Sequence, residues 1–335
     1  METLLITGSN GEIGHGLIPF LYKKGYKKIF AIDKNKTDEN LRKYIEESFV
    51  LDIRDSETVK SLIEKISPSA IFHLAAILST SSEKDPEMAI SVNSRGTENL
   101  LKIANNLAQK RKTTIKFIFP STIAVYGLPD LETKKKVGSV KENQFLEPIT
   151  IYGITKLYSE KIGLYFSQNY KLLSSDSPRY LDFRCIRFPG IISALTLPTG
   201  GTSDYAPEMI HSAAKGEGYE SFVRPDTKIP FMVMPDAVKA LISIFEAPKG
   251  KLKNKIYNVQ SFSITAKEIS ELINETFPDS SISYNPDPQR QRIVDSWPES
   301  IDDSLARTDW GWQPDFDLIK SFKDYLIPEI RKRYS

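Results

Sequence analysis

The chain has 335 residues, of which 40% are hydrophobic, and a chain of this length and composition can bury a large core. Its 45 basic and 43 acidic side chains nearly balance, so no basic field indicates a nucleic acid or an anionic membrane as partner. No apolar run approaches the ~20 residues that span a bilayer.

Cysteine and histidine are scarce. The single cysteine, Cys185, excludes an internal disulfide and suits a reducing compartment. The three histidines lack the spacing of metal ligands, so no metal site is expected. The first apolar run begins almost at the first residue, so no signal or transit segment is expected. We therefore expect a cytoplasmic location, or a mitochondrial one if the source is eukaryotic.

Short apolar runs alternate with amphipathic stretches, which is typical of βαβ units and a parallel sheet. Strands are expected at residues 4–7, 29–32, 49–51, 70–74, 116–120, 182–188 and 256–259. Helices are expected at residues 57–66, at 88–107 and from 152 to about 165. The run Lys134-Lys135-Lys136 is interpreted as a solvated loop, and residues 174–178 as a polar turn. The pattern predicts an α/β fold of the Rossmann type, a doubly wound parallel sheet, with a smaller C-terminal lobe.

A glycine-rich turn follows the first strand in the string Thr7-Gly8-Ser9-Asn10-Gly11-Glu12-Ile13-Gly14. Such a turn lets the backbone approach a pyrophosphate, and the next helix presents free N–H groups and the positive end of its dipole. The turn therefore predicts a dinucleotide site.

An aspartate ends the second predicted strand. Asp33 lies near the ~20-residue offset expected for the acid that hydrogen-bonds an adenosine ribose. A carboxylate there repels a 2′-phosphate, so NAD is expected in preference to NADP. The alternative is a simple turn aspartate in Asp33-Lys34-Asn35. Asp52-Ile53 follows the third strand and either flanks the adenine or only ends the strand.

Tyr152 and Lys156 lie four residues apart in a predicted helix and so project from one face. An ammonium there favours the phenolate and lowers the tyrosine pKa, which predicts a general base beside the cofactor. Ser121 and Thr122 end the fifth strand, where a hydroxyl can orient a substrate oxygen. The alternative is that these hydroxyls only form hydrogen bonds within the turn that ends the strand.

Five motifs together resemble the extended short-chain dehydrogenase/reductase superfamily, which includes UDP-galactose 4-epimerase and sugar-nucleotide dehydratases. They are the turn at residues 8–14, His73-Leu74-Ala75-Ala76, Val92-Asn93-x-x-Gly96-Thr97, Val125-Tyr126-Gly127 and Tyr152-x-x-x-Lys156. The resemblance implies a catalytic triad of Thr122, Tyr152 and Lys156. It implies NAD-binding positions at Gly8, Asn10, Gly11, Glu12, Ile13, Asp33, Lys34, Asp52, Ile53, Leu74, Ala75, Ala76, Asn93, Tyr152, Lys156 and Ile191.

Within that superfamily, the later strings are similar to the short-chain L-threonine 3-dehydrogenases. They are the residues 198–205, Met234-Pro235-Asp236-Ala237, Asp295-Ser296-Trp297-Pro298 and Arg307-x-Asp309-Trp310-Gly311-Trp312. In sugar-nucleotide members an asparagine that holds the nucleotide follows the strand-end arginine by three residues, but here Gly190 follows Arg187.

This second resemblance implies metal-free oxidation of L-threonine by NAD at the β-hydroxyl carbon, giving L-2-amino-3-oxobutanoate. The implied substrate residues are Ser79, Ser121, Thr122, Tyr152, Thr202 and Trp297. It also implies a homodimer in which the helices containing Met88 and Tyr152 pair with a twin subunit. Two segments depart from the family: Thr199 replaces the first of three glycines, and residues 133–143 do not match closely.

The character of the sequence changes after Arg187, where Pro and Gly cluster, and from Ser261 onward the predicted helices are short and separated by polar loops. We expect residues 1–188, with about 229–260, to form the NAD-binding domain, and residues 189–228 and 261–335 to form a discontinuous substrate-binding lobe. The alternatives are an NAD-dependent sugar-nucleotide epimerase or dehydratase and, from another class, a non-catalytic NAD-sensing protein. Proteins of the second kind typically lose the tyrosine or the lysine, and both are present here.

Overall fold

The computed structural model describes residues 2–174, 178–198 and 200–334. A seven-stranded sheet forms its centre, with the strand order β11-β7-β5-β4-β1-β2-β3, and all neighbouring strands run parallel. The strands are β1 (Thr3–Thr7), β2 (Lys28–Asp33), β3 (Glu47–Val50), β4 (Ala70–His73), β5 (Ile115–Thr122), β7 (Leu181–Phe188) and β11 (Ile256–Asn258). The predicted Rossmann-type fold is confirmed.

Each predicted strand is present, and the ends differ by one or two residues. The third strand begins at Glu47 rather than at residue 49, because this edge strand exposes most of its side chains and its first residues are polar. The fifth strand continues through Ser121 and Thr122, which pair with Arg187 and Phe188 of β7.

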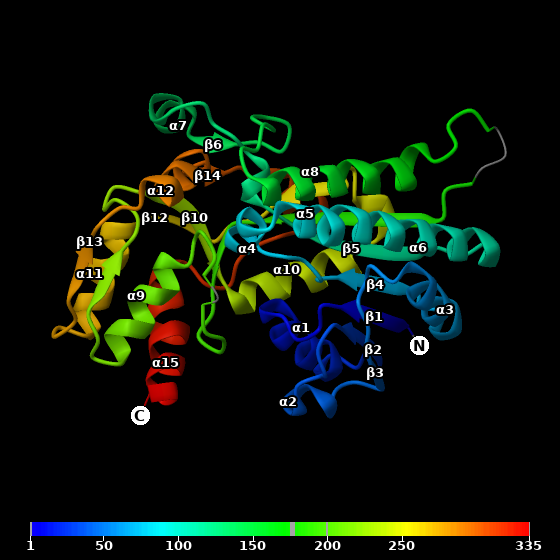
Figure 1. The fold of residues 1–335 in the computed structure, drawn as a ribbon, viewed down its shortest axis with the longest axis horizontal. Coiled ribbons are helices and arrows are strands. Elements are labelled where there is room, and N and C mark those ends of the chain that lie inside the picture. Colours follow the sequence, from blue (N-terminus) through cyan, green and yellow to red (C-terminus); the bar gives the residue numbers. More distant parts are fainter. Residues whose placement is uncertain (1, 175–177, 199, 335) are drawn as a thin grey trace.

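Helices cover both faces of the sheet (Figure 1). One face carries α3 (Ser56–Ile66), α6 (Thr97–Arg111) and α8 (Ile151–Leu164), and the other carries α1 (Glu12–Lys23) and α10 (Met234–Glu246). Each layer has its own buried apolar cluster, because each helix turns an apolar stripe toward the sheet. The helix expected at 88–107 is a continuous run of α5 (Pro86–Ala89), a π-helical segment η1 (Ile90–Gly96) and α6. The helix expected from 152 to about 165 is α8, extended by η3 (Tyr165–Asn169).

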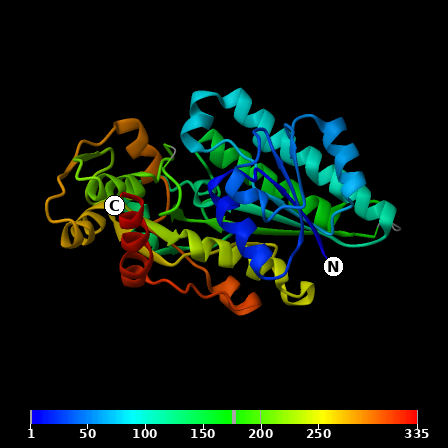
Figure 2. The same ribbon diagram turned by 90° about the horizontal axis from the view of Figure 1, so that it is seen from below.

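The second half of the chain forms most of a smaller lobe at one end of the sheet (Figures 1 and 2). Its strands are β8 (Gly190–Ile192), β9 (Tyr219–Ser221), β10 (Lys228–Val233), β12 (Phe262–Thr265), β13 (Ile282–Tyr284) and β14 (Ser300–Ile301). Three of them form a sheet with the order β12-β10-β8. The others form two-stranded sheets, in which β13 pairs with β9 and β14 pairs with β6 (Ser139–Val140). Its helices include α9 (Tyr205–Ala214), α11 (Ala266–Thr276), α12 (Pro288–Asp295) and α15 (Ile327–Tyr334). The short helix α4 (Ser79–Lys84) packs against α5 and α8 beside the central sheet.

The lysine run is not a solvated loop. It lies in α7 (Leu131–Val137), whose N-terminus is capped by the Asp130 side chain, which accepts a hydrogen bond from Thr133 N. Lys134 is buried at 3% exposure, whereas Lys135 and Lys136 are exposed. The prediction failed because three adjacent charges look alike in sequence, and only the packing of α7 against the end of α12 separates them.

Of the predicted turn at 174–178, residues 175–177 lie outside the described residues, and so does Thr199. Cys185 is buried in β7 as a free thiol. Across residues 2–174, 178–198 and 200–334, no helix combines the length and the apolar character needed to cross a membrane.

Candidate active site

The carboxyl ends of the parallel strands meet at one edge of the sheet, where open α/β folds bind their ligands. Two cavities adjoin there and share four lining residues, Gly8, Gly11, Leu74 and Ala76. The glycine turn after β1 therefore lies at their junction.

The first cavity extends over the ends of β1, β2 and β4. Among its lining residues are Asn10, Asp33, Lys34, Asp52, Ile53 and Ala75, which are predicted NAD-binding positions. A second set, which the sequence interpretation did not include, comprises Ile32, Asn35, Leu51, Arg54, Ile77, Met88 and Val92. Most of this second set directly flank predicted positions in the chain.

The turn geometry explains why glycine is required in two places. Gly8 has φ +70°, and a Cβ there would lie 2.5 Å from Ala75 N. A Cβ on Gly14 would lie 2.1 Å from Ser9 O. Because Gly8 has no side chain, the turn can lie against the backbone that follows β4. Because Gly14 has none, α1 can begin directly behind the turn. The resulting open backbone fits a dinucleotide pyrophosphate at the N-terminus of α1.

Asp33 and Asp52 both border the first cavity and already have protein partners. The Asp33 carboxylate accepts hydrogen bonds from Asn10 N at 2.9 Å and Asn35 N at 3.0 Å, which ties β2 to the glycine turn. Asp52 forms an ion pair with Arg54 at 2.7 Å, and the hydrogen bond from that guanidinium lowers the pKa of the carboxyl. The Asp33 carboxylate is thus held at the end of β2, where it can accept a hydrogen bond from a ribose hydroxyl.

The second cavity lies between the sheet edge and the smaller lobe. It brings together predicted residues from distant segments, namely Glu12, Ile13, Ser79, Ser121, Thr122, Tyr152, Lys156, Ile191, Thr202 and Trp297. All six proposed substrate residues therefore share one cavity, and so do all three proposed catalytic residues.

Tyr152 and Lys156 begin α8, whose N-terminus is capped by Thr150. The Lys156 Nζ lies 5.8 Å from the centre of the Tyr152 ring and donates to Pro120 O at 2.8 Å. Burial lowers the pKa of Lys156 to about 8. Burial also raises the pKa of Tyr152 well above its ordinary value, so the expected lowering is wrong for the ligand-free protein. Spacing correctly placed both groups on one face, but it did not reveal how deeply the site is buried.

The two hydroxyls at the end of β5 differ in their surroundings. Ser121 Oγ donates to Glu160 at 2.6 Å, and Glu160 also accepts two hydrogen bonds from buried Arg187. Thr122 Oγ1 accepts from Ala124 N at 3.1 Å, which leaves its own proton available for a ligand oxygen. The structure thus favours Thr122 over Ser121 as the hydroxyl that faces a substrate.

Ser79 and Thr202 meet across the cavity although they are far apart in the chain. Thr202 donates to Ser79 Oγ through its backbone N at 3.2 Å and its Oγ1 at 3.0 Å. Both residues are buried, and Trp297, at 5% exposure, lines the same cavity. Two hydroxyls and an indole form a wall suited to a small polar ligand with an apolar part.

Two acidic side chains also line this cavity. Glu12 accepts a hydrogen bond from Thr196 Oγ1 at 2.7 Å. Although its side chain is exposed, the loss of solvent around its carboxyl in the cavity, with a contribution from the charge of Asp204, raises its pKa. Asp204 was not predicted, although it lies two residues beyond Thr202. Its carboxylate accepts from Gly201 N at 2.6 Å.

Asn93 is the predicted NAD-binding residue that does not line either cavity. Its side chain is buried, accepts from Ile77 N at 2.8 Å and donates to Ile77 O at 3.0 Å. It therefore supports the wall at residues 76–78 from behind. Within the described part of the chain, no cluster of His, Cys, Asp and Glu side chains could hold a metal ion.

A glycine turn that fits a dinucleotide, beside a cavity lined by a half-buried tyrosine and a buried lysine, defines an NAD-dependent enzyme of the short-chain dehydrogenase/reductase type. The sequence model of the NAD dependent epimerase/dehydratase family matches residues 4–259, and the chain belongs to this family. Its cofactor is NAD.

Named relatives narrow the class to NAD-dependent dehydrogenases. The chain is 35% identical over 326 residues to the mitochondrial L-threonine 3-dehydrogenase of Bos taurus, covering 95% of this chain and 80% of the bovine protein. A monomeric L-threonine 3-dehydrogenase from a metagenome is 38% identical with a TM-score of 0.86, over 99% of this chain and all of that one. The L-threonine dehydrogenase of Clostridium difficile is 32% identical with a TM-score of 0.88, over all of this chain and 99% of that one.

Proposed function

We propose that the protein oxidises L-threonine with NAD+ at the β-hydroxyl carbon, giving L-2-amino-3-oxobutanoate, NADH and a proton. The observation that carries the proposal is the shared cavity, which is lined by the Tyr152–Lys156 pair, the hydrogen-bonded Ser79–Thr202 pair and Trp297. The names of relatives about one third identical in sequence agree with this substrate.

Tyr152 is the proposed general base. It takes the proton of the β-hydroxyl, while Thr122 donates a hydrogen bond to the same oxygen and orients it. Bound NAD+ supplies the hydride acceptor and a positive charge to the site. Because burial alone holds the Tyr152 phenol neutral, positive charge is needed to stabilise the phenolate. Lys156 contributes its ammonium, which Pro120 O holds in place.

The remaining cavity residues are proposed to bind the amino acid. Ser79 and Thr202 supply hydroxyls for the carboxylate and ammonium groups, and Trp297 covers the methyl side. Gly190 opposes the sugar-nucleotide alternative. A Cβ there would lie 2.6 Å from the ring of buried Phe231, so an asparagine cannot replace it without displacing that ring.

NAD is proposed to extend from the Asp33 end of the first cavity to Tyr152 and Ile191 in the second. The division of the chain follows from this placement. Residues 1–188, with about 229–260, would form the NAD-binding domain, although β10 within them pairs with β8 and β12. Residues 189–228 and 261–335 would form the substrate-binding lobe. We also propose a cytoplasmic location, or a mitochondrial one in a eukaryotic source, because the free Cys185 suits a reducing compartment. Fractionation of source cells tests this, and recovery in a secreted or other oxidising compartment would contradict it.

The test is NADH formation by the purified protein with NAD+ and L-threonine. We expect activity that falls sharply with L-allo-threonine, because inversion at the β-carbon moves the hydroxyl away from Tyr152. We expect it to fall with NADP+, because Asp33 repels a 2′-phosphate, and to persist with a chelator. NADH from a UDP-sugar but not from threonine would favour the epimerase or dehydratase alternative.

We propose a homodimer formed through the helices that contain Met88 and Tyr152, which are the continuous run of α5, η1 and α6 and the helix α8. Ile90, Ile154 and Tyr158 on these segments are 38%, 48% and 39% exposed, an apolar surface that a twin subunit would cover. Light scattering should give twice the chain mass of 37.9 kDa, and Ile154→Glu should give the monomer mass. A wild-type protein that is monomeric at micromolar concentration, as its metagenomic relative is named, would contradict the dimer.

A further inference from the structure

The place of Trp297 depends on the end of α12. The backbone N of Trp297 donates to Val294 O at 3.1 Å, and the preceding carbonyl, of Ser296, accepts from Leu128 N at 2.8 Å. The backbone on the N-terminal side of the indole is therefore anchored by hydrogen bonds that lie outside the cavity. A contact that holds Val294 O in place therefore also holds Trp297, which forms part of the cavity wall.

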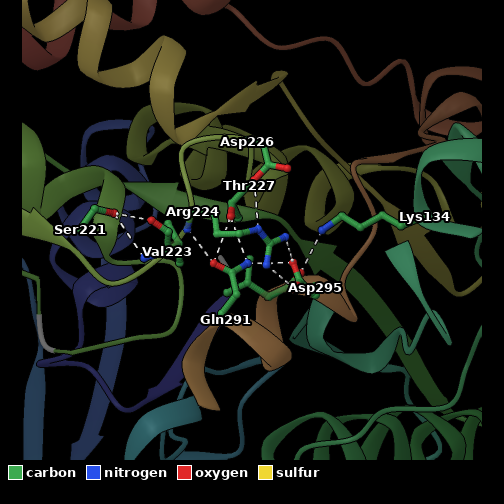
Figure 3. A network of polar contacts seen from close by, with 9 residues as sticks. Lys134, Ser221, Val223, Arg224, Asp226, Thr227, Gln291 and Asp295 are labelled. Carbon is green, nitrogen blue, oxygen red and sulfur yellow. Dashed lines mark hydrogen bonds and ion pairs between the residues drawn. The ribbon is translucent and has the colours of Figure 1, made fainter. Parts of the chain in front are cut away.

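A buried cation holds that carbonyl. Lys134 Nζ donates to Val294 O at 3.0 Å, and Figure 3 shows its side chain reaching from α7 toward the end of α12. A cation is favourable at the carboxyl end of a helix. Burying an ammonium is nevertheless costly, and here burial lowers the pKa of Lys134 to about 8. The charged groups that face it are Asp295, Glu299 and Asp226, which favour the ammonium, and Arg224, which opposes it.

Arg224 fixes the same helix end from the other side. Its guanidinium makes two hydrogen bonds of 2.9 Å to the carboxylate of Asp295, to which Gln291 also donates at 2.8 Å (Figure 3). At the start of α12, Arg290 donates to Gly201 O at 3.0 Å, next to Thr202. One short helix thus carries Trp297 and supports Thr202, so a shift of α12 moves two walls of the substrate cavity together.

We propose that Lys134 and Arg224 are positioning residues for the substrate, because they fix the end of α12 and thereby hold Trp297 against the cavity. Neither side chain lines the catalytic cavity. The inference rests on the proposed function in one respect, that Trp297 contacts the amino acid. Lys134 lies outside the motifs that carry the family resemblance, so its role is argued from the contacts of this chain alone.

The test replaces Lys134 with Met, which keeps the length of the side chain and removes its donor. We expect KM for L-threonine to rise by about tenfold to a hundredfold, with kcat less affected and NAD affinity unchanged, because a wall of the substrate cavity has moved. The matched control is Lys135→Met, the same substitution at the next position of α7, where the side chain is exposed. Lys134→Arg, which restores a donor, should recover part of the loss.

Trp297 emission gives a readout that needs no substrate. The difference spectrum between each protein and the same protein carrying Trp297→Phe isolates this indole from Trp310 and Trp312. We expect that difference spectrum to shift to longer wavelength in Lys134→Met, as water reaches the indole, and to stay unchanged in Lys135→Met. If Lys134→Met does not fold, Arg224→Lys provides a second test, because it removes the paired hydrogen bonds to Asp295 at a partly exposed site. This variant should show the same rise in KM and the same shift of the Trp297 spectrum, both to a smaller degree.

Two results would overturn the proposal. One is a folded Lys134→Met protein with wild-type KM and a wild-type Trp297 spectrum. The other is an equal loss of NAD affinity and threonine affinity, which would indicate general damage. Failure of the wild-type protein to oxidise threonine would contradict the proposed function alone, since the Trp297 spectrum still reports whether Lys134 positions the indole.

Discussion

Tyr152→Phe is expected to lower kcat for threonine oxidation by about 10²- to 10⁴-fold while NAD binding stays intact, because general-base catalysis contributes a factor of that size. The phenol oxygen is the only atom removed, and the ring still fills its place among the residues that line the cavity. Wild-type turnover should rise with pH, since burial raises the Tyr152 pKa and the base form must be populated. The residual turnover of the variant should lose that rise. Stopped-flow NADH absorbance and NAD titration measure the two effects.

Tyr158→Phe is the matched control for this experiment. Tyr158 lies in the same helix, but its hydroxyl donates to Glu98 at the surface, at 2.8 Å. It should keep wild-type turnover. A Tyr152→Phe protein that retains wild-type kcat would remove Tyr152 from the chemistry and would revive the view of the chain as a non-catalytic NAD-binding protein.

The central sheet could be predicted because its information is local. Most of the buried parallel strands are short apolar runs, and the glycine turn after β1 is dictated by backbone geometry that glycine favours, as at Gly8. The smaller lobe could not be predicted in the same way. Its strands β14 and β6 have two residues each and come from positions about 160 apart, so neither carries a periodic signal.

The residues of the site also differ in whether the sequence could predict them. Residues that occupy motif positions, such as Tyr152 and Lys156, were identified from spacing and from resemblance. Residues that act through a packing partner were not: Lys134 looked like a surface charge, and Arg290 bears on the site only through Gly201 O. The Tyr152 pKa was wrongly expected to fall because sequence spacing reports proximity to Lys156 but not the loss of water around both.

Lys156→Met should abolish most activity and yet stabilise the ligand-free protein, which makes it the sharpest test of the burial argument. Burial lowers the Lys156 pKa from 10.5 to about 8, so keeping its charge at pH 7 costs about 3 kcal/mol of folding free energy. Losing the hydrogen bond to Pro120 O and the contact with the Phe119 ring, 4.6 Å away, offsets about 1–2 kcal/mol of the gain. We expect a net gain of about 1–2 kcal/mol and a higher Tm, against a loss in turnover of about 10²-fold or more.

The pH dependence identifies the cause. Because the unfolded chain binds a proton at Lys156 between about pH 8 and pH 10.5 and the folded chain does not, this lysine makes the unfolding free energy of the wild type rise with pH across that window. Lys156→Met should lack this contribution, so its stability advantage should shrink from pH 7 to pH 10 in urea unfolding without NAD. Lys161→Met, an exposed position of the same helix, should change neither activity nor this slope. A variant less stable than wild type at pH 7 would show that the buried ammonium holds the apo fold together instead of straining it.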